Sequence, residues 1–179
     1  MNESAEQLYL VPGGYPVTID VAQATVGGAG TALHFTLPLR GHNLPLKHER
    51  ESKLVTALDG ELVVRSGGVA IAVLRQGEAI VLDSHIAHRI HQRGAQPSTV
   101  GVALWPGAVE QAFREQAARV TAGAYDHDDM VRIYAAYGVR WDGGGDAAAP
   151  AAEVKPLAHW MGSLPPALAA AIAQRWPVR

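Results

Sequence analysis

Histidines and carboxylates are the only side chains of this sequence that are plausible metal ligands. The chain has eight histidines and no cysteine, which excludes disulfides, thiolate nucleophiles and cysteine-based zinc sites. Histidine also titrates near neutral pH and can act as a general acid or base. Two stretches carry several of the histidines: residues 44–62 contain His48, and residues 77–94 contain His85, His88 and His91. We therefore look for the chemistry of the protein in these stretches.

The two stretches resemble the two sequence motifs of the cupin superfamily. The first motif reads G-x5-H-x-H, then three or four residues, E, six residues and G, and the second reads G-x5-P-x-G-x2-H-x3-N. The two motifs lie between Gly41 and Gly94, and together with the strands around them the resemblance covers about half of the chain. It implies a jelly-roll β-barrel that encloses a cup. In many relatives it also implies an iron or other divalent ion that activates dioxygen or a chelated small molecule.

The second motif matches in spacing. Gly77 opens it, and His88 falls on the histidine ligand of the family. Asp83 stands where the family has proline, and His85 stands where it has glycine. Gln92 takes the place of the asparagine. His88 is therefore a candidate ligand by position.

The first motif matches only in part. His48 falls on the second histidine, and Gly60 falls on the terminal glycine. Leu46 occupies the place of the first histidine, and Lys53 occupies the place of the glutamate. Two of the four ligands that the family uses are therefore missing.

The retained histidines, His48 and His88, are the candidate metal ligands. Neutral imidazoles and carboxylates bind a divalent ion, whereas a protonated lysine such as Lys53 offers no lone pair and repels the ion. Iron, zinc, nickel or manganese would therefore need a third protein donor, or waters that complete the shell. The candidate third donors are His34, His42 and Glu51.

Lys53 is a candidate catalytic and ligand-binding residue. The resemblance places its side chain inside the barrel, where a buried lysine is costly without a partner. In one interpretation His48, Lys53 and His88 line a cationic cup that favours a carboxylate, enolate or phosphate on a small ligand. Lys53 and His88 are then the catalytic pair. In the other interpretation, the lysine extends to solvent or pairs with a nearby carboxylate.

The other histidines have different expected places. His34 and His42 are further candidate ligand-binding residues, and the alternative for both is a polar wall or the surface. His34 alternates with Leu33 and Phe35, so it lies on the opposite face of its strand from them. The remaining four are expected in solvent: His85, His91, His127 and His159.

Two further groups are expected outside the cup. The charged run Glu49-Arg50-Glu51 is interpreted as a solvated turn with weak surface ion pairs, unless it is folded inside. The tryptophans fall at the end of the predicted barrel or after it, and we expect them to pack the helical tail. They are Trp105, Trp141, Trp160 and Trp176.

An all-β fold is predicted for residues 15–106, as an antiparallel jelly-roll barrel. Short β-rich runs alternate there with glycine, proline and asparagine. Asp59-Gly60 stands between two adjacent runs, where glycine supplies the positive φ of a tight hairpin. The eight runs are Val17–Val21, Ala32–Leu39, Lys53–Leu58, Glu61–Arg65, Val69–Leu74, Ala79–Asp83, His88–His91 and Thr99–Trp105.

A helical extension is predicted for residues 107–141. Apolar residues recur at helical spacing from Val109 to Val120 and from Met130 to Tyr137, and Asp126 can cap the second helix. This part looks like the post-barrel helices of small quercetin-dioxygenase-like bacterial cupins. Residues 142–156 are rich in glycine and alanine and are expected to form a linker or loop. Residues 157–179 are expected to hold a C-terminal helix.

Composition and charge exclude some partners. Hydrophobic residues make up 48% of the chain and charged residues 18%, so it can bury a core. The net charge is −2 and no lysine and arginine cluster is present, so nucleic acid is not expected as a partner. No segment reads as a signal peptide or membrane span, so we expect no membrane partner and a cytoplasmic location.

Two functions from different classes remain open. One is an enzyme of cupin type that acts on a small oxygenated or acidic molecule, as a metal-dependent dioxygenase or an isomerase. The other is a metal-free cupin that binds or senses a ligand without catalysis. A transcription factor with a cupin sensor is disfavoured, because no basic helix-turn-helix segment is present. A homodimer that covers exposed sheet edges is expected.

Overall fold

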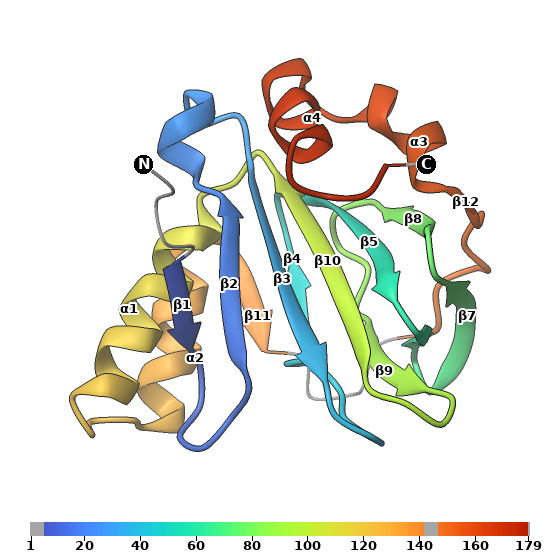
Figure 1. Ribbon diagram of the computed structural model, residues 1–179. Helices are drawn as coiled ribbons and strands as arrows, with labels where there is room; N and C mark the ends of the chain where they lie inside the picture. The colour runs from blue at the N-terminus through green and yellow to red at the C-terminus, as the bar shows by residue number, and fades with distance from the viewer. Residues whose placement is uncertain (1–5, 142–146, 179) are drawn as a thin grey trace.

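The computed structural model of the protein describes residues 6–141 and 147–178 (Figure 1). All eight predicted strands are present, and four short strands are added to them in the described residues. The predicted strands are β2 (Pro16–Val21), β3 (Thr31–Leu37), β5 (Ser52–Asp59), β6 (Glu61–Ser66), β7 (Val69–Arg75), β8 (Glu78–Leu82), β9 (Arg89–Arg93) and β10 (Ser98–Trp105). The additional strands are β1 (Glu6–Tyr9), β4 (Leu46–His48), β11 (Val139–Trp141) and β12 (Lys155–Pro156).

The strand order is that of a jelly roll. The larger sheet has the order β1-β2-β3-β10-β5-β8-β12, and a second sheet has the order β7-β6-β9. Strand β4 pairs with β11, and a bridge between His42 and His91 joins the chain just before β4 to β9. From β3 to β10 the chain thus passes repeatedly between two antiparallel layers, which confirms the predicted fold class. Within the described residues the sheets do not close into one continuous barrel.

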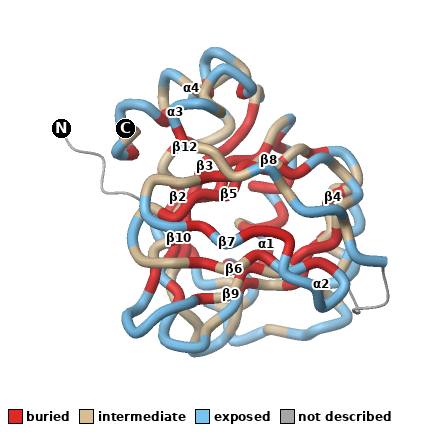
Figure 2. The backbone as a smooth tube through the Cα atoms, turned by 90° about the vertical axis from the view of Figure 1, so that its right-hand side faces the viewer, coloured by how far each residue is buried: buried red, intermediate tan, exposed pale blue. Residues whose placement is uncertain are grey.

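Alternation along each strand decides which side chains face the interior. On β5, Val55 and Ala57 belong to the main core between the layers, together with Val102 of β10. Leu54 and Ala103 point the other way, into a second apolar cluster on the outer face of the large sheet. Figure 2 shows buried residues along the strands and exposed residues at the connections. Lys53 therefore shares the inner face of β5 with Val55.

Two helices and a returning strand follow β10. Helix α1 (Val109–Thr121) and helix α2 (His127–Ala136) lie side by side next to β1 (Figure 1). The predicted cap is confirmed, because the Asp126 side chain accepts a hydrogen bond from the backbone N–H of Asp129 at 3.0 Å. Strand β11 then pairs with β4 in a register that sets Val139 opposite His48. The helical extension thus returns to the strand that carries a candidate ligand.

The C-terminal part covers the outer face of the large sheet. It contains α3 (Leu157–Trp160), the 3-10 helix η2 (Met161–Ser163) and α4 (Pro166–Ala173). Leu168 and Ile172 of α4 are fully buried against Leu54 and Ala103. Before α3 in the chain, the backbone N–H of Ala152 donates a hydrogen bond to the carbonyl of Ile71 of β7 at 2.9 Å.

Part of the predicted linker, residues 142–146, lies outside the described residues. In the parts of the chain that are described, no helix has both the length and the apolar character needed to cross a membrane.

Candidate functional site

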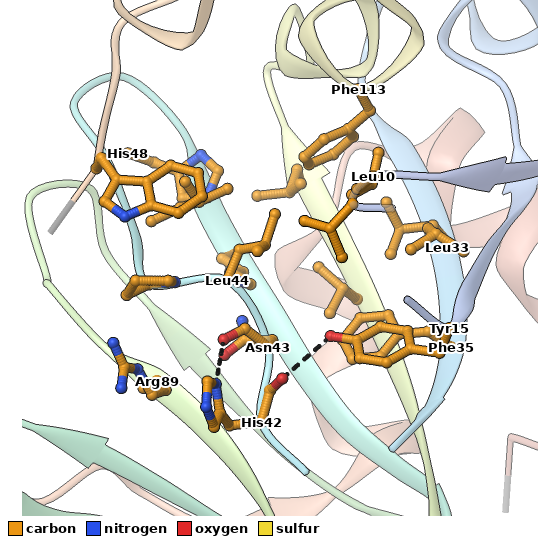
Figure 3. A pocket seen from close by; sticks show the side chains of 18 residues that line it. Leu10, Tyr15, Leu33, Phe35, His42, Asn43, Leu44, His48, Arg89 and Phe113 are labelled. Carbon is orange, nitrogen blue, oxygen red and sulfur yellow. Dashed lines mark hydrogen bonds between the residues drawn. The ribbon is translucent and has the colours of Figure 1, made fainter. Parts of the chain in front are cut away.

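A cavity of about 440 Å³ lies inside the fold (Figure 3). Its walls are mostly apolar and include Leu33 and Phe35 of β3 and Val102 and Leu104 of β10. A cavity of this size and character is suited to a small organic molecule. The polar residues that line it are Tyr15, His42, Asn43, His48, Lys53 and Arg89.

His48 and Glu51 form a buried pair at this cavity. Nδ1 of His48 lies 2.9 Å from Oε2 of Glu51, and each residue is 3% exposed. The other oxygen of Glu51, Oε1, accepts a hydrogen bond from the backbone N–H of Val109 at 3.1 Å. Val109 is the first residue of α1, where the helix dipole favours a carboxylate. Glu51 thus ties His48 to the start of α1.

The position of Glu51 corrects the interpretation of the charged run 49–51 as a solvated turn. Glu49 is half-buried and Arg50 is exposed, and Oε1 of Glu49 pairs with Nε of Arg140 at 2.5 Å. Glu51 is folded inside because α1 supplies a backbone donor for its carboxylate. Since both of its oxygens are engaged, Glu51 serves the site by holding His48.

Burial disfavours the charged form of both partners in this pair. Burial, together with the charge of Lys53, lowers the pKa of His48 to about 3. Burial raises the pKa of Glu51 to about 7, although the backbone N–H groups of Val109 and Ala108 favour the carboxylate. His48 is therefore neutral at pH 7. When Glu51 is ionised, Nδ1–H donates to it and Nε2 of His48 keeps a lone pair. When Glu51 is protonated, Glu51 donates to Nδ1 and the proton of His48 is on Nε2.

Lys53 lies inside, as predicted, and lines the cavity. It is 6% exposed, and burial lowers its pKa to about 8, against the effect of Glu51. Among the described residues, no carboxylate lies within ion-pair distance of its ammonium group. An ammonium in such a place is costly, because burial removes its hydration without supplying a counterion. The alternative interpretation, a lysine that extends to solvent, does not hold.

His88 is buried behind the cavity. It is 3% exposed, and its Nδ1 donates to the carbonyl of Ile86 at 2.9 Å. Since a carbonyl only accepts, Nε2 carries the lone pair, and this atom is buried without a hydrogen-bond partner in the described residues. Burial lowers the pKa of His88 well below the usual value, and the charges of Lys53 and His48 act in the same direction. His88 is thus an electrostatic neighbour of Lys53 but does not line the cavity wall.

The donor set does not fit a divalent metal held by the protein. His48 and His88 each have Nδ1 engaged and Nε2 free to coordinate, which is how metal-binding histidines are usually oriented. However, Lys53 occupies the place of the carboxylate ligand, and Glu51 is bonded elsewhere. In residues 6–141 and 147–178, no three histidine or acidic side chains are grouped to bind a metal ion. The third donor proposed from the sequence is not supplied by His34, His42 or Glu51.

His34 lies away from the cavity, on the outer face of the large sheet. Its neighbours on the strand, Leu33 and Phe35, line the cavity, so the alternation of β3 turns His34 outward. Its Nδ1 lies 2.8 Å from Oδ2 of Asp20, which also accepts from Nε1 of Trp176 at 2.8 Å. The Asp20 carboxylate raises the pKa of His34. The role proposed for His34 as a ligand-binding residue is therefore corrected: His34 pairs with Asp20, the carboxylate that also binds Trp176 of the C-terminal segment.

Other motif residues have structural roles. His85, at the glycine position of the family, has φ of 69°, a conformation that favours glycine, and it is exposed as expected. Its backbone N–H donates to the carbonyl of His48 at 2.7 Å. Gln92 accepts from the backbone of Arg40 at 2.8 Å and so holds the loop before β4. His127 and His159 are exposed, whereas His91 is half-buried beside His42.

Among the cavity residues that sequence reasoning missed are Trp141, Arg89 and Tyr15. Trp141 of β11 lines the cavity, although we expected this residue to pack only against the helices. It also makes an edge contact with Tyr134 of α2. Arg89 and Tyr15 also line the cavity, and Tyr15 stacks on Phe35 with ring centroids 5.3 Å apart. Arg89 adjoins the motif histidine His88, which was the available signal for it.

The chain is similar to several solved structures. A predicted oxalate decarboxylase from Thermotoga maritima is 20% identical, and the match covers 57% of this chain and 91% of that one with a TM-score of 0.49. An RmlC-like cupin from Shewanella frigidimarina is 16% identical, over 62% of this chain and 92% of that one, with a TM-score of 0.47. A double-stranded β-helix protein from Klebsiella pneumoniae is 15% identical over 45% of this chain, with a TM-score of 0.43, and the match spans only 66% of its length.

No protein-family model and no curated protein matches the sequence. The strand order of the two sheets, β3-β10-β5-β8 and β7-β6-β9, defines the architecture. The chain has the cupin fold.

Proposed function

We propose that the protein binds a small organic acid in its cavity. The acidic group lies at the end of the cavity that holds His48 and Lys53, and an apolar body lies along the walls. The observation that carries this proposal is the buried ammonium of Lys53, which lines the cavity with no ion pair in the described residues. A ligand carboxylate would supply the counterion that the described residues do not supply. The neutral His48 beside it adds a hydrogen-bonding group to the same end.

The walls support the apolar part of the ligand. Leu33, Phe35, Val102 and Leu104 face the cavity, and Phe113 of α1 and Trp141 of β11 add aromatic surface. Burial of such a body against apolar walls supplies affinity, at about 25 cal/mol per Å² of apolar surface. The polar groups at the end supply orientation and selectivity. This arrangement favours a metal-free binding cup over a metal-dependent dioxygenase.

The test is a titration of small carboxylates into the protein and into Lys53→Met by calorimetry. Removal of the ammonium should weaken binding at least about thirtyfold, since loss of one partner of a buried charge pair typically costs 2 kcal/mol or more. Lys155→Met is the matched control, because Lys155 pairs with Glu153 at 3.1 Å outside the cavity. Equal affinities of Lys53→Met and the unchanged protein for every acid that binds would overturn the proposal.

A second candidate is proton transfer on the bound acid, as in an isomerase without a metal. The observation that favours it is that His48, which lines the cavity together with Lys53, is paired with the buried Glu51. Nε2 of His48 would accept a proton from the carbon next to the carboxylate. Lys53 would stabilise the negative charge that develops on the oxygen. Exchange of that proton for solvent deuterium, followed by NMR, tests the idea; exchange that persists in His48→Gln would contradict it.

A further inference from the structure

The mouth of the cavity carries a second group of basic side chains. Arg89 is half-buried and His42 is exposed, and both line the cavity. In Figure 3, Arg89 and His42 lie at one end of the view and His48 at the other, with Leu44 between them. The buried end, with His48 and Lys53, and the exposed mouth, with His42 and Arg89, are thus separate parts of one cavity.

Among residues 6–141 and 147–178, no carboxylate pairs with the positive charge at the mouth. Arg89 of β9 stands directly opposite Arg65 of β6 in the strand register. Like charges in directly opposite positions are destabilising. Among the described residues, neither arginine forms an ion pair with a carboxylate, and the side chain of Arg65 donates a hydrogen bond to the carbonyl of Gly68 at 3.0 Å.

Another arginine on the same two strands does have a carboxylate opposite it. Two residue pairs further along the outer face, Arg93 of β9 stands opposite Glu61 of β6, with 3.8 Å between Nε and Oε2. Between the two pairs lies His91, whose ring centroid is 5.6 Å from that of His42. Burial lowers the pKa of His91, as do the charges of His42, Arg89 and Arg65. Arg93 thus has a carboxylate opposite it, whereas Arg89 at the cavity mouth has another arginine opposite it.

We infer that the mouth is a second anion subsite, and that the ligand is an elongated diacid with one acidic group at Lys53 and the other at Arg89 and His42. This inference rests on the proposed function, because it takes the first acidic group from there. The guanidinium can bind a carboxylate in a bidentate manner. The apolar stretch between the two ends, which includes Leu44, matches a hydrocarbon chain or an aromatic ring between the acidic groups. The subsite selects diacids over monoacids of equal length.

The experiment compares hexanoate, octanoate and decanoate with hexanedioate, octanedioate and decanedioate by calorimetry. The best diacid should bind the unchanged protein about tenfold more tightly than its monoacid, since hydrogen bonds to a charged group are worth about this much. Arg89→Gln should remove that preference, because it weakens the binding of diacids at least about tenfold more than the binding of monoacids. Arg93→Gln is the matched control on the same strand face and should keep the preference. Thermal unfolding of each variant confirms that it is folded.

The possible results separate the two proposals. If monoacids and diacids bind equally and both depend on Lys53, the second subsite is refuted and the proposed function stands. A diacid preference that survives Arg89→Gln also refutes the subsite. If no acid of either series binds, the proposed function is refuted together with this inference.

Discussion

Nδ1 of His48 lies 2.9 Å from one oxygen of Glu51, while the other oxygen accepts from the first backbone N–H of α1. Glu51 therefore connects an imidazole of the cavity wall to the helical extension. The same extension returns through β11 to pair with β4, where Val139 stands opposite His48. His48 is thus held from both sides by residues that follow the jelly roll in sequence. The helical extension is part of the site.

Acid binding should weaken as the pH rises through 7 and again through 8. Ionisation of Glu51, with a pKa of about 7, adds a negative charge near the bound carboxylate. Deprotonation of Lys53, with a pKa of about 8, then removes the positive charge. Each step should cost on the order of tenfold in affinity, as expected for charges a few ångströms apart in a partly shielded site. Calorimetry across this pH range measures both steps.

Glu51→Gln isolates the two steps, because it removes the first and leaves the second. The variant should show a single decline, which begins below pH 8 because the charge of Glu51 no longer raises the pKa of Lys53. Two steps in this variant would contradict the assignment to Glu51.

Lys53→Met should stabilise the protein. The folded pKa of Lys53, about 8, lies below the usual 10.5, so the folded state binds fewer protons than the unfolded state between these values. The buried ammonium therefore costs about 3 kcal/mol at pH 7, from about 1.4 kcal/mol per pKa unit. The gain in unfolding free energy should be largest below pH 8 and should vanish as the pH rises toward 10.5. Urea unfolding at several pH values measures it, and a Lys53→Met variant that is less stable at pH 7 would contradict the account.

His85→Gly should also stabilise the protein, by about 1 kcal/mol. His85 has φ of 69°, and the left-handed conformation costs about 1–2 kcal/mol for a residue with a Cβ atom. Glycine avoids that cost and loses part of the gain through the entropy of the unfolded chain. Ser84→Gly is the control, because Ser84 is not among the residues with positive φ and should lose stability. The two variants are compared by thermal unfolding, and equal effects would refute the role of φ.

Metal analysis of the protein purified without an affinity tag should find well below one divalent ion per chain, even after anaerobic loading with iron, zinc, nickel or manganese. The reason is that Lys53 stands in the place of a carboxylate ligand and both oxygens of Glu51 are engaged. His48→Ala and His88→Ala should then show the same metal content as the unchanged protein. One equivalent of metal that both variants lose would restore the metal-dependent interpretation.

The fold was predictable because each long strand carries its own signal. Alternation along β5 and the Asp59-Gly60 turn are local, and the two motifs indicated the jelly roll independently. Strands β4 and β11 have three residues each, and β11 pairs with a strand about ninety residues earlier. Such short elements exist through tertiary pairing, which local patterns do not reveal.

The site was predictable only where the motifs carried it. Lys53 and His48 were placed inside through the cupin resemblance, and the structure puts both at the cavity. The burial of Glu51 was not predicted, because it depends on the backbone of Val109, which is distant in sequence. The alternation of His34 with Leu33 and Phe35 was enough by itself to exclude His34 from the cavity. A role for Arg89 could not be predicted without the strand register, because the register shows that Arg89 stands opposite Arg65 and not opposite a carboxylate.

The most direct test of the account is the pKa of the Lys53 ammonium, measured by NMR of side-chain-labelled lysine with and without a bound acid. The chain has three lysines, so Lys53→Met assigns the signal. The account predicts a pKa of about 8 in the free protein and a clear rise when octanedioate saturates the cavity, because a bound carboxylate favours the charged form. A pKa that does not change at saturation would show that the acid binds away from Lys53 and would contradict the central claim.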